Sequence, residues 1–287
     1  MFTTLSPIDV ALDVSFAESV ALAAKAGFDA VDLSMEELVD SPAALSASEI
    51  EEKLAQAELR AGGWWLPIEY REDQITYEAG LEVFARAVPL AEQVGAIWCN
   101  TWLIPFHDEL DYAANLTLHV ERLRPVAATL GEHGCVLGLE FVAPKTLRVP
   151  HPYEFVSTIP QTLELIDAIG EPNVGVLLDC WQWYTSHGTP EELTSLTADQ
   201  VTYVHVNDAP AGLEIDQQID NQRMLPGATG VIPVRTFLEA LVGMRFDGPV
   251  AVEPFNAEFN ELEPHTRVRI AMASLSATFA EAGVALA

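Results

Sequence analysis

Positive charge is scarce in this sequence. The 287 residues include 14 Lys and Arg against 43 Asp and Glu, which gives a formal net charge of −29 at pH 7. Because such a chain repels nucleic-acid phosphates and anionic lipids, we expect no nucleic-acid or membrane partner. The simplest explanation of the acidity is solubility.

Long apolar runs and paired cysteines are also missing. No run approaches the ~20 apolar residues that span a bilayer, and Met1–Val10 lacks the basic and apolar regions of a secretory signal. Cys99, Cys135 and Cys180 form no CxxC pair, which is typical of buried free thiols in a reducing compartment. We therefore expect a cytoplasmic protein.

Strand-like and helix-like segments alternate along the chain. The predicted strands are Phe2–Leu5, Ala30–Met35, Trp64–Ile68, Ile97–Leu103, Val136–Val142, Val174–Trp181, Val201–Asn207 and Val250–Phe255. The predicted helices are Phe16–Ala26, Ala47–Ala61, Tyr77–Gln93, Leu116–His133, Phe155–Ile169, Thr236–Met244 and Thr266–Ala282. We expect Gly27, Gly62, Gly134 and Gly170 to end helices, and Ser46 with Glu49 to form a capping box.

This alternation predicts a parallel sheet. Eight units in 287 residues average about 36 residues each, which suits an α/β fold of the (β/α)8, or TIM, barrel type. A doubly wound open sheet is the alternative, but the segment Leu5–Asp9 after the first strand is no Gly-rich phosphate loop. No linker is apparent, so we predict one domain over residues 1–287. The longest irregular stretch, Ala209–Pro233, is long enough to form a lid.

Ionisable residues close four successive predicted strands, the fifth to the eighth: Glu140, Asp179, His205 and Glu253. Active sites of such barrels lie at the carboxyl ends of the strands, so these side chains should converge. Taken singly, an acid at a strand end is usually solvated or caps the next helix, and a lone histidine is more often packed than a ligand. The four together favour a functional site.

A divalent cation would resolve the repulsion in this cluster. Three carboxylates at close range destabilise one another unless they are protonated or compensated. Oxygen ligands with one imidazole suit Mn²⁺, Mg²⁺, Co²⁺ or Zn²⁺ better than a thiolate-preferring metal. We expect one ion, with Mn²⁺ as the first choice.

These motifs resemble those of a known family. The stretches in question are Gly138–Phe141, Asn173–Ser186, Tyr203–Asp208, Arg223–Gly227 and Pro249–Glu253, with the early segment Ala24–Leu33. In order and spacing they are similar to the xylose isomerase-like superfamily, and within it to the sugar phosphate isomerase/epimerase group that includes ketose 3-epimerases and inosose dehydratases. The resemblance spans nearly the whole chain. It implies a keto-sugar or polyol substrate, and a homodimer or homotetramer.

The resemblance also implies residue roles. In ketose 3-epimerases, the residues that match Glu140, Asp179, His205 and Glu253 bind one divalent metal. Those that match Glu140 and Glu253 also act as acid and base on opposite faces of the substrate, so that one carboxylate removes a proton and the other returns one. The metal stabilises the enediolate formed between these steps. Arg223 matches an arginine that contacts substrate oxygens, although an arginine that anchors a lid explains it equally.

One departure leaves the reaction open. Many relatives have Asp-x-x-His where this chain has Asp179-Cys-Trp-Gln182, and a glutamine beside the substrate exchanges hydrogen bonds but takes up no proton near neutral pH. The first hypothesis is an isomerase or epimerase. The second is a lyase, either a dehydratase of the inosose or dehydroshikimate type or an enzyme that cleaves C-glycosides by β-elimination. The third is a barrel that binds ligand without catalysis.

Four further residues are candidates for substrate binding. Trp102 and Trp183 lie near predicted strand ends, where an aromatic wall suits a sugar ring or an aromatic aglycone, although core packing is the ordinary role of tryptophan. Lys145 and His151 lie in the loop after the fifth strand. Lys145 would bind a phosphate, a carboxylate or a sugar hydroxyl, unless it forms a local ion pair.

Overall fold

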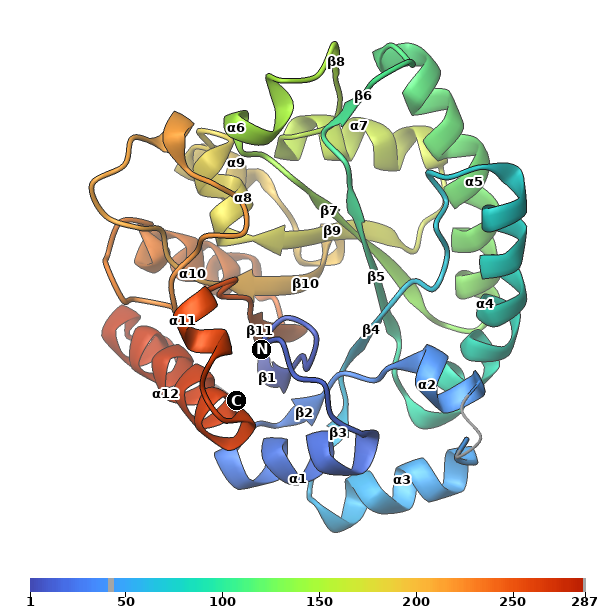
Figure 1. Cartoon of the computed structure of the whole chain (residues 1–287), viewed down its shortest axis with the longest axis vertical. Helices are drawn as coiled ribbons and strands as arrows, with labels where there is room; N and C mark the ends of the chain where they lie inside the picture. Colours follow the sequence, from blue (N-terminus) through green and yellow to red (C-terminus); the bar gives the residue numbers. More distant parts are fainter. Residues whose placement is uncertain (41–43, 286–287) are drawn as a thin grey trace.

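The computed structural model describes residues 1–40 and 44–285. Its main sheet has nine strands, paired in parallel and ringed by helices (Figure 1). These strands are β1 (Phe2–Leu5), β2 (Ala30–Val31), β3 (Arg60–Ala61), β4 (Gly63–Trp65), β5 (Trp98–Leu103), β7 (Val136–Phe141), β9 (Val174–Asp179), β10 (Val201–Val206) and β11 (Pro249–Val252). The predicted barrel class is confirmed.

Helices cover the outside of the sheet (Figure 1). The longer ones are α1 (Phe16–Ala26), α3 (Ala47–Gln56), α4 (Gln74–Val94), α5 (Tyr112–Glu132), α7 (Ile159–Ile169), α10 (Val234–Met244) and α12 (Pro264–Ala282). The shorter ones are α2 (Met35–Asp40), α6 (Lys145–Arg148), α8 (Cys180–Thr185), α9 (Pro190–Ser195), α11 (Ala257–Asn260), η1 (Ala198–Gln200) and η2 (Ile215–Gln217). A second, antiparallel sheet pairs β6 (Phe106–His107) with β8 (Tyr153–Glu154).

The ring of strands closes at Gly62, which lies between β3 and β4. β3 pairs with β2, and β4 pairs with β5. Gly62 N–H donates to Val31 O over 2.8 Å. The segment from β3 through Gly62 to β4 therefore pairs with β2 at its start and with β5 at its end, which closes the ring. A Cβ on Gly62 would lie 2.2 Å from Asp32 Oδ1, so this position requires glycine.

The prediction that Gly62 ends a helix is therefore wrong. α3 ends at Gln56 instead of Ala61, because Arg60 and Ala61 pair with β2. The capping box at its start is confirmed, since Ser46 Oγ accepts from Glu49 N–H and the Glu49 carboxylate accepts from Ser46 N–H. Gly27 and Gly170 end α1 and α7 in the left-handed conformation, as expected.

Four predicted strands end two or more residues earlier in the structure: Ala30–Met35, Trp64–Ile68, Val174–Trp181 and Val250–Phe255. β2 stops at Val31, because the chain turns there and α2 begins at Met35. β9 stops at Asp179, whose carboxylate accepts from Trp181 N–H at the start of α8. The segment Ala209–Pro233 is irregular as predicted, apart from η2 and a bridge between Asp208 and Met224.

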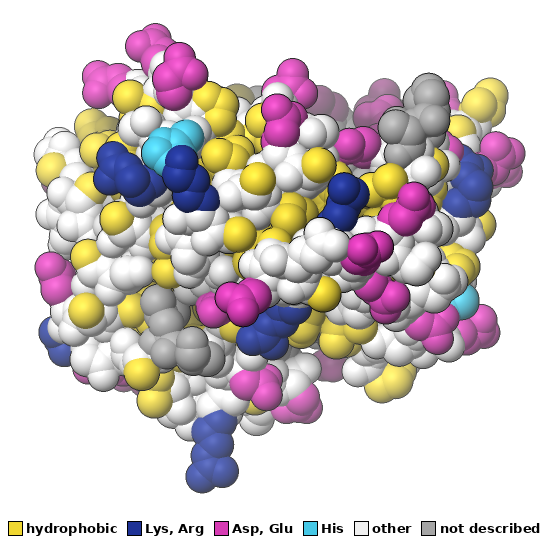
Figure 2. All heavy atoms as spheres, turned by 90° about the horizontal axis from the view of Figure 1, so that it is seen from below, with side chains coloured by type: hydrophobic (Ala, Val, Ile, Leu, Met, Phe, Trp, Pro, Cys, Tyr) yellow, Lys and Arg dark blue, Asp and Glu magenta, His cyan; other side chains and the backbone are white. Residues whose placement is uncertain are grey.

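Burial follows from the closed architecture. Every residue of β9 and β10 is buried, because one face meets the barrel interior and the other meets helices. The three cysteines are buried and free. Within residues 1–40 and 44–285, no helix has the length and apolar character needed to cross a bilayer. Acidic side chains are scattered over the face in Figure 2, with few basic ones among them.

Candidate active site

Four adjacent strands bring the predicted cluster together. Glu140 lies in β7, Asp179 ends β9, His205 lies in β10 and Glu253 directly follows β11. One ligand atom from each residue lies within 4.8 Å of the others, and all four side chains are buried. The strand-end argument therefore placed these residues correctly in space.

Several polar atoms of this cluster lack hydrogen-bond partners. Glu140 Oε1 and both ring nitrogens of His205 are buried with no partner. His205 Nδ1 lies 3.5 Å from Glu140 Oε1 and 3.4 Å from Glu253 Oε2. Unpartnered buried polar atoms are costly and rare, so their concentration here indicates a site that binds a ligand. The oxygen and imidazole donors of the cluster, with these free atoms, fit a divalent metal ion.

Arg223 reaches the same cluster from the long loop after β10. Its Nη1 donates to Asp179 Oδ2 over 2.7 Å and also to Glu253 Oε2. Its Nη2 donates to Asp220 Oδ1 over 2.9 Å. The guanidinium lies over the ring of Phe255, with 4.6 Å from its central carbon to the ring centroid. Arg223 is thus a buried cation that offsets part of the negative charge.

The site still favours additional positive charge. Burial raises the pKa of Glu140 well above its ordinary value, and the nearby charge of Glu253 adds to this rise. Burial also raises the pKa of Asp179, although Arg223 opposes the shift. Burial alone would lower the pKa of His205, but the charges of Glu253 and Asp9 raise it well above normal. Proton or metal uptake would relieve this imbalance.

Asp9 is a site residue that our sequence reasoning missed. It follows β1 and is 5% exposed, and its Oδ2 lies 3.2 Å from His205 Nε2 without the alignment of a hydrogen bond. It could have been found by the same rule as the others, because an acid soon after the first strand also faces the mouth of the barrel. A carboxylate there would orient the imidazole of a metal-bound histidine.

Gln182 lies beside the cluster with both ends of its amide engaged. Its Oε1 accepts from Ala143 N–H over 2.9 Å, and its Nε2 donates to Asp220 Oδ1 over 3.2 Å. Asp220, which sequence reasoning also missed, therefore joins Gln182 to Arg223. These bonds tie the β7–α6 connection to the long loop and hold Gln182 at the edge of the site.

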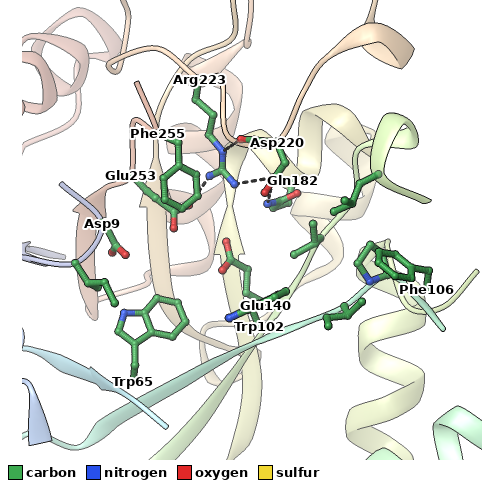
Figure 3. A pocket seen from close by; sticks show the side chains of 15 residues that line it. Asp9, Trp65, Trp102, Phe106, Glu140, Gln182, Asp220, Arg223, Glu253 and Phe255 are labelled. Atoms are coloured by element: carbon green, nitrogen blue, oxygen red, sulfur yellow. Dashed lines mark hydrogen bonds and ion pairs between the residues drawn. The ribbon is translucent and has the colours of Figure 1, made fainter. Parts of the chain in front are cut away.

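A cavity of about 420 Å³ opens above the cluster. Figure 3 shows Glu140, Glu253, Arg223, Asp220 and Gln182 on one side of it, with Phe106 on the other. Its lining comprises Ile8, Asp9, Trp65, Trp102, Ile104, Pro105, Phe106, Glu140, Val142, Leu147, Gln182, Asp220, Arg223, Glu253 and Phe255. The volume suits a small molecule.

Of the predicted substrate-binding residues, Trp102, Gln182 and Arg223 line this cavity. The other three, Trp183, Lys145 and His151, do not. Trp183 lies in α8, because β9 ends earlier than predicted, and it packs against Phe237. Lys145 Nζ donates to Asp216 Oδ2 over 2.5 Å, which is the local ion pair considered above. His151 stacks on Phe106 and thus lies behind the cavity wall.

Residues 20–278 match the family model described as the xylose isomerase-like TIM barrel. The chain belongs to this family.

Curated relatives catalyse more than one reaction. An inosose isomerase of Halalkalibacterium halodurans is 27% identical, and the match covers 48% of this chain and only 46% of that protein. A ketose 3-epimerase of Arthrobacter globiformis is 25% identical over 65% of the chain and 59% of its own length. A 3-dehydroshikimate dehydratase of Pseudomonas putida is 24% identical over 66% of the chain and 28% of its own length. These relatives support an enzyme but leave the reaction type open.

Solved structures share the whole fold. A xylose isomerase domain protein from Alicyclobacillus acidocaldarius has a TM-score of 0.88 and 28% identity, and the match covers 99% of both chains. A structure of an IOLI protein with a bound zinc atom has a TM-score of 0.82 over 98% of this chain and 99% of that one, at 19% identity.

Proposed function

We propose that this protein is a divalent-metal-dependent isomerase or epimerase of a keto-sugar or related polyol. The observation that carries the proposal is the buried cluster on four adjacent strands, in which Glu140 and His205 keep unpartnered atoms. The isomerase and epimerase among the relatives supply the reaction class. Glu140, Asp179, His205 and Glu253 would hold the metal, and we propose Mn²⁺ as the native ion.

The chain's own residues would carry out the proton transfers. A bound divalent metal would polarise the substrate carbonyl and its neighbouring hydroxyl and offset the charge of an enediolate. Of Glu140 and Glu253, one carboxylate would remove the proton next to the carbonyl and the other would deliver a proton. In the cluster without a metal, burial and the charge of Glu253 raise the pKa of Glu140 and so favour its protonated form.

Three neighbours would position the substrate. Arg223 would act through the acids it binds, because its guanidinium holds the carboxylates of Asp179 and Glu253 in place. Gln182, held by Ala143 and Asp220, would orient a hydroxyl without changing its own charge. Trp102 lines the cavity and would contact the apolar part of the substrate.

A lyase is the second candidate, and the dehydratase among the relatives favours it. The first step would be the same abstraction of a proton next to a carbonyl, followed by loss of a leaving group from the adjacent carbon. One carboxylate would take the proton, and the other, protonated, would give a proton to the departing oxygen. The two reactions therefore differ in product and share the site.

The first test is the metal content of the purified protein by elemental mass spectrometry. We expect close to one equivalent of a divalent metal, Mn²⁺ first, and its loss in His205→Ala. Val242→Ala, a change of an exposed residue on α10, serves as the control. No metal in the wild type after incubation with each cation would overturn the proposed site.

The second test is incubation of the metal-loaded protein with a panel of keto-sugars and inososes in D₂O. Deuterium at one carbon of an otherwise intact sugar supports the isomerase or epimerase, whereas an unsaturated product supports the lyase. Glu140→Gln and Glu253→Gln should each abolish the reaction. Metal binding without exchange or product across the panel would favour a non-catalytic barrel. Light scattering tests the predicted homodimer or homotetramer.

A further inference from the structure

The cavity above the cluster has an apolar side, of which the proposed function uses only Trp102. It consists of Trp102, Ile104, Pro105, Phe106, Val142 and Leu147, which we call the apolar wall. These residues come from β5, β6, α6 and the connections after β5 and β7. Figure 3 shows Phe106 across the cavity from Arg223 and Gln182. A ligand that reaches from the cluster to this side meets carbon surface.

The two aromatic rings of the apolar wall are held in place from behind. The Arg71 guanidinium lies 4.1 Å from the Trp102 ring centroid, and its Nη1 donates to Trp102 O over 3.1 Å. Phe106 stacks on His151 with ring centroids 3.3 Å apart, and His151 Nδ1 lies 2.8 Å from Asp108 Oδ1. Because these contacts restrict the rings before any ligand arrives, binding would cost little side-chain entropy.

Trp102 is nevertheless 40% exposed at the mouth of the cavity. When a flat apolar group stacks on a partly exposed, immobilised indole, the contact contributes favourable binding free energy. The wall is therefore suited to an aromatic or other flat apolar group, in contrast to the hydroxyl-rich end expected at the metal cluster.

The charge around the cavity argues against a phosphate. Among its described lining residues, Arg223 is the one cation, and it is already engaged by Asp179, Asp220 and Glu253. Lys145 lies outside the lining and is paired with Asp216. A phosphoryl group would have to be stripped of water beside carboxylates and carbon, without a free cation to receive it.

We infer that the substrate of this site is an unphosphorylated keto-sugar or polyol that carries a flat apolar substituent at the end remote from the reacting carbons. The polar end would lie on Glu140 and Glu253, and the substituent would lie between Trp102 and Phe106. This inference rests on the proposed function for the identity of the polar end. The preference for the substituent is a property of the wall and can be measured without turnover.

The test uses three ligands with the same ketose end: D-fructose, D-fructose 6-phosphate and 6-O-benzyl-D-fructose. Binding to the Mn²⁺-loaded protein is measured by calorimetry. We expect the benzyl ether to bind about tenfold more tightly than D-fructose, because one well-placed aromatic contact supplies about that factor. D-Fructose 6-phosphate should bind most weakly. Equal binding of the benzyl ether and D-fructose, no binding by either, or tightest binding of the phosphate would overturn the inference.

Variants assign the preference to the wall. Trp102→Ala and Phe106→Ala should each remove most of the preference for the benzyl ether over D-fructose, whereas Val242→Ala should keep that preference. Phe106→Leu keeps an apolar side chain at the same position if Phe106→Ala fails to fold. A preference that survives in both wall variants would contradict the assignment.

The two proposals fail in different ways. A benzyl preference without deuterium exchange in any ligand would reject the proposed reaction and leave the substrate inference standing. Deuterium exchange in D-fructose without a benzyl preference would support the reaction and reject the inference.

Discussion

Asp32 and Glu140 are both buried carboxylates at the mouth of one barrel, with opposite surroundings. Asp32 Oδ1 accepts from Thr4 Oγ1 over 2.6 Å and from Gly63 N–H over 2.7 Å, and its Oδ2 accepts from the Tyr203 hydroxyl over 2.6 Å. Glu140 Oε1, in contrast, is buried without any partner. Asp32 therefore joins three strands of the barrel, whereas Glu140 keeps its acceptor capacity free.

The difference separates a structural acid from a functional one. A buried carboxylate whose oxygens all accept hydrogen bonds stabilises the fold through its donors. Removing it leaves those donors without an acceptor. A buried carboxylate with empty positions contributes little to the fold and is available to a cation or a substrate. Each prediction below tests one side of this contrast.

The largest expected effect is on catalysis by Glu140→Gln. We expect kcat to fall about 10³-fold, because the variant can no longer exchange a proton. The free energy of unfolding of the metal-free protein should change by less than about 1 kcal/mol, since no donor loses its acceptor. Isotope exchange and urea denaturation measure the two quantities. An unfolded variant would show that Glu140 is structural as well.

Asp32→Ala should show the reverse pattern. Three buried donors lose their acceptor, and each unsatisfied group costs ~1–3 kcal/mol. We expect the free energy of unfolding to fall by at least about 3 kcal/mol, measured by urea denaturation beside Glu140→Ala as the matched variant. Equal losses in the two variants would remove the distinction between the two acids.

Metal binding should stabilise the wild type through the free acceptors. Mn²⁺ at 100 times its dissociation constant is expected to add about 2.7 kcal/mol to the free energy of unfolding, which a rise in Tm detects. Asp32→Asn should keep the Mn²⁺ effect and Glu140→Ala should lose it. Stabilisation that persists in Glu140→Ala would place the metal elsewhere.

Asp32 should also make stability depend on pH. Burial raises the pKa of Asp32 from 3.8 to about 6, although its three hydrogen bonds oppose the shift. The native state therefore holds a proton that the unfolded chain has released, and this contribution to stability is complete below about pH 4 and lost as the pH rises through 6. The free energy of unfolding of the wild type minus that of Asp32→Asn should fall over this window. A difference that rises with pH would contradict the assignment.

The smallest effect is expected for Lys145→Ala. Its ion pair with Asp216 is half exposed and lies outside the cavity lining, so both Tm and kcat/KM should stay unchanged within measurement. Arg223→Lys, a change within the cluster, serves as the contrasting variant in the same measurements of Tm and kcat/KM, because lysine cannot reproduce the forked contacts to several carboxylates. A marked rise in KM for Lys145→Ala would show that Lys145 binds substrate.

Prediction from sequence succeeded where chain order and spatial order coincide. The four residues of the cluster lie at or near the carboxyl ends of neighbouring parallel strands: Glu140, Asp179, His205 and Glu253. The barrel therefore brings them together regardless of the conformation of the connecting loops. It was less successful where a boundary of one or two residues mattered. Trp183 was expected at the mouth, but the side chain of Asp179 caps α8 and turns the tryptophan towards Phe237.

The loops were the other source of difference. Asp9 and Asp220 reach the site from segments without regular structure, and their positions depend on contacts with His205, Gln182 and Arg223 from distant parts of the chain. The position of Asp9 soon after β1 was a usable signal, whereas no local pattern encodes the contacts of Asp220. Likewise, the sequence shows Phe106 and His151 in separate loops, and only the pairing of β6 with β8 brings them into a stack.

The sequence by itself determined the barrel, the order of its strands and the four ligand-type residues at its mouth, because the alternation of apolar strands and amphipathic helices is a local property of the chain. Only the tertiary structure decided which buried acid has hydrogen-bond partners and which has a free oxygen, and that an apolar wall lies across the cavity from Arg223. Hydrogen-bond satisfaction and cavity lining are set by groups that meet in space from opposite ends of the chain, as Asp32 and Tyr203 do.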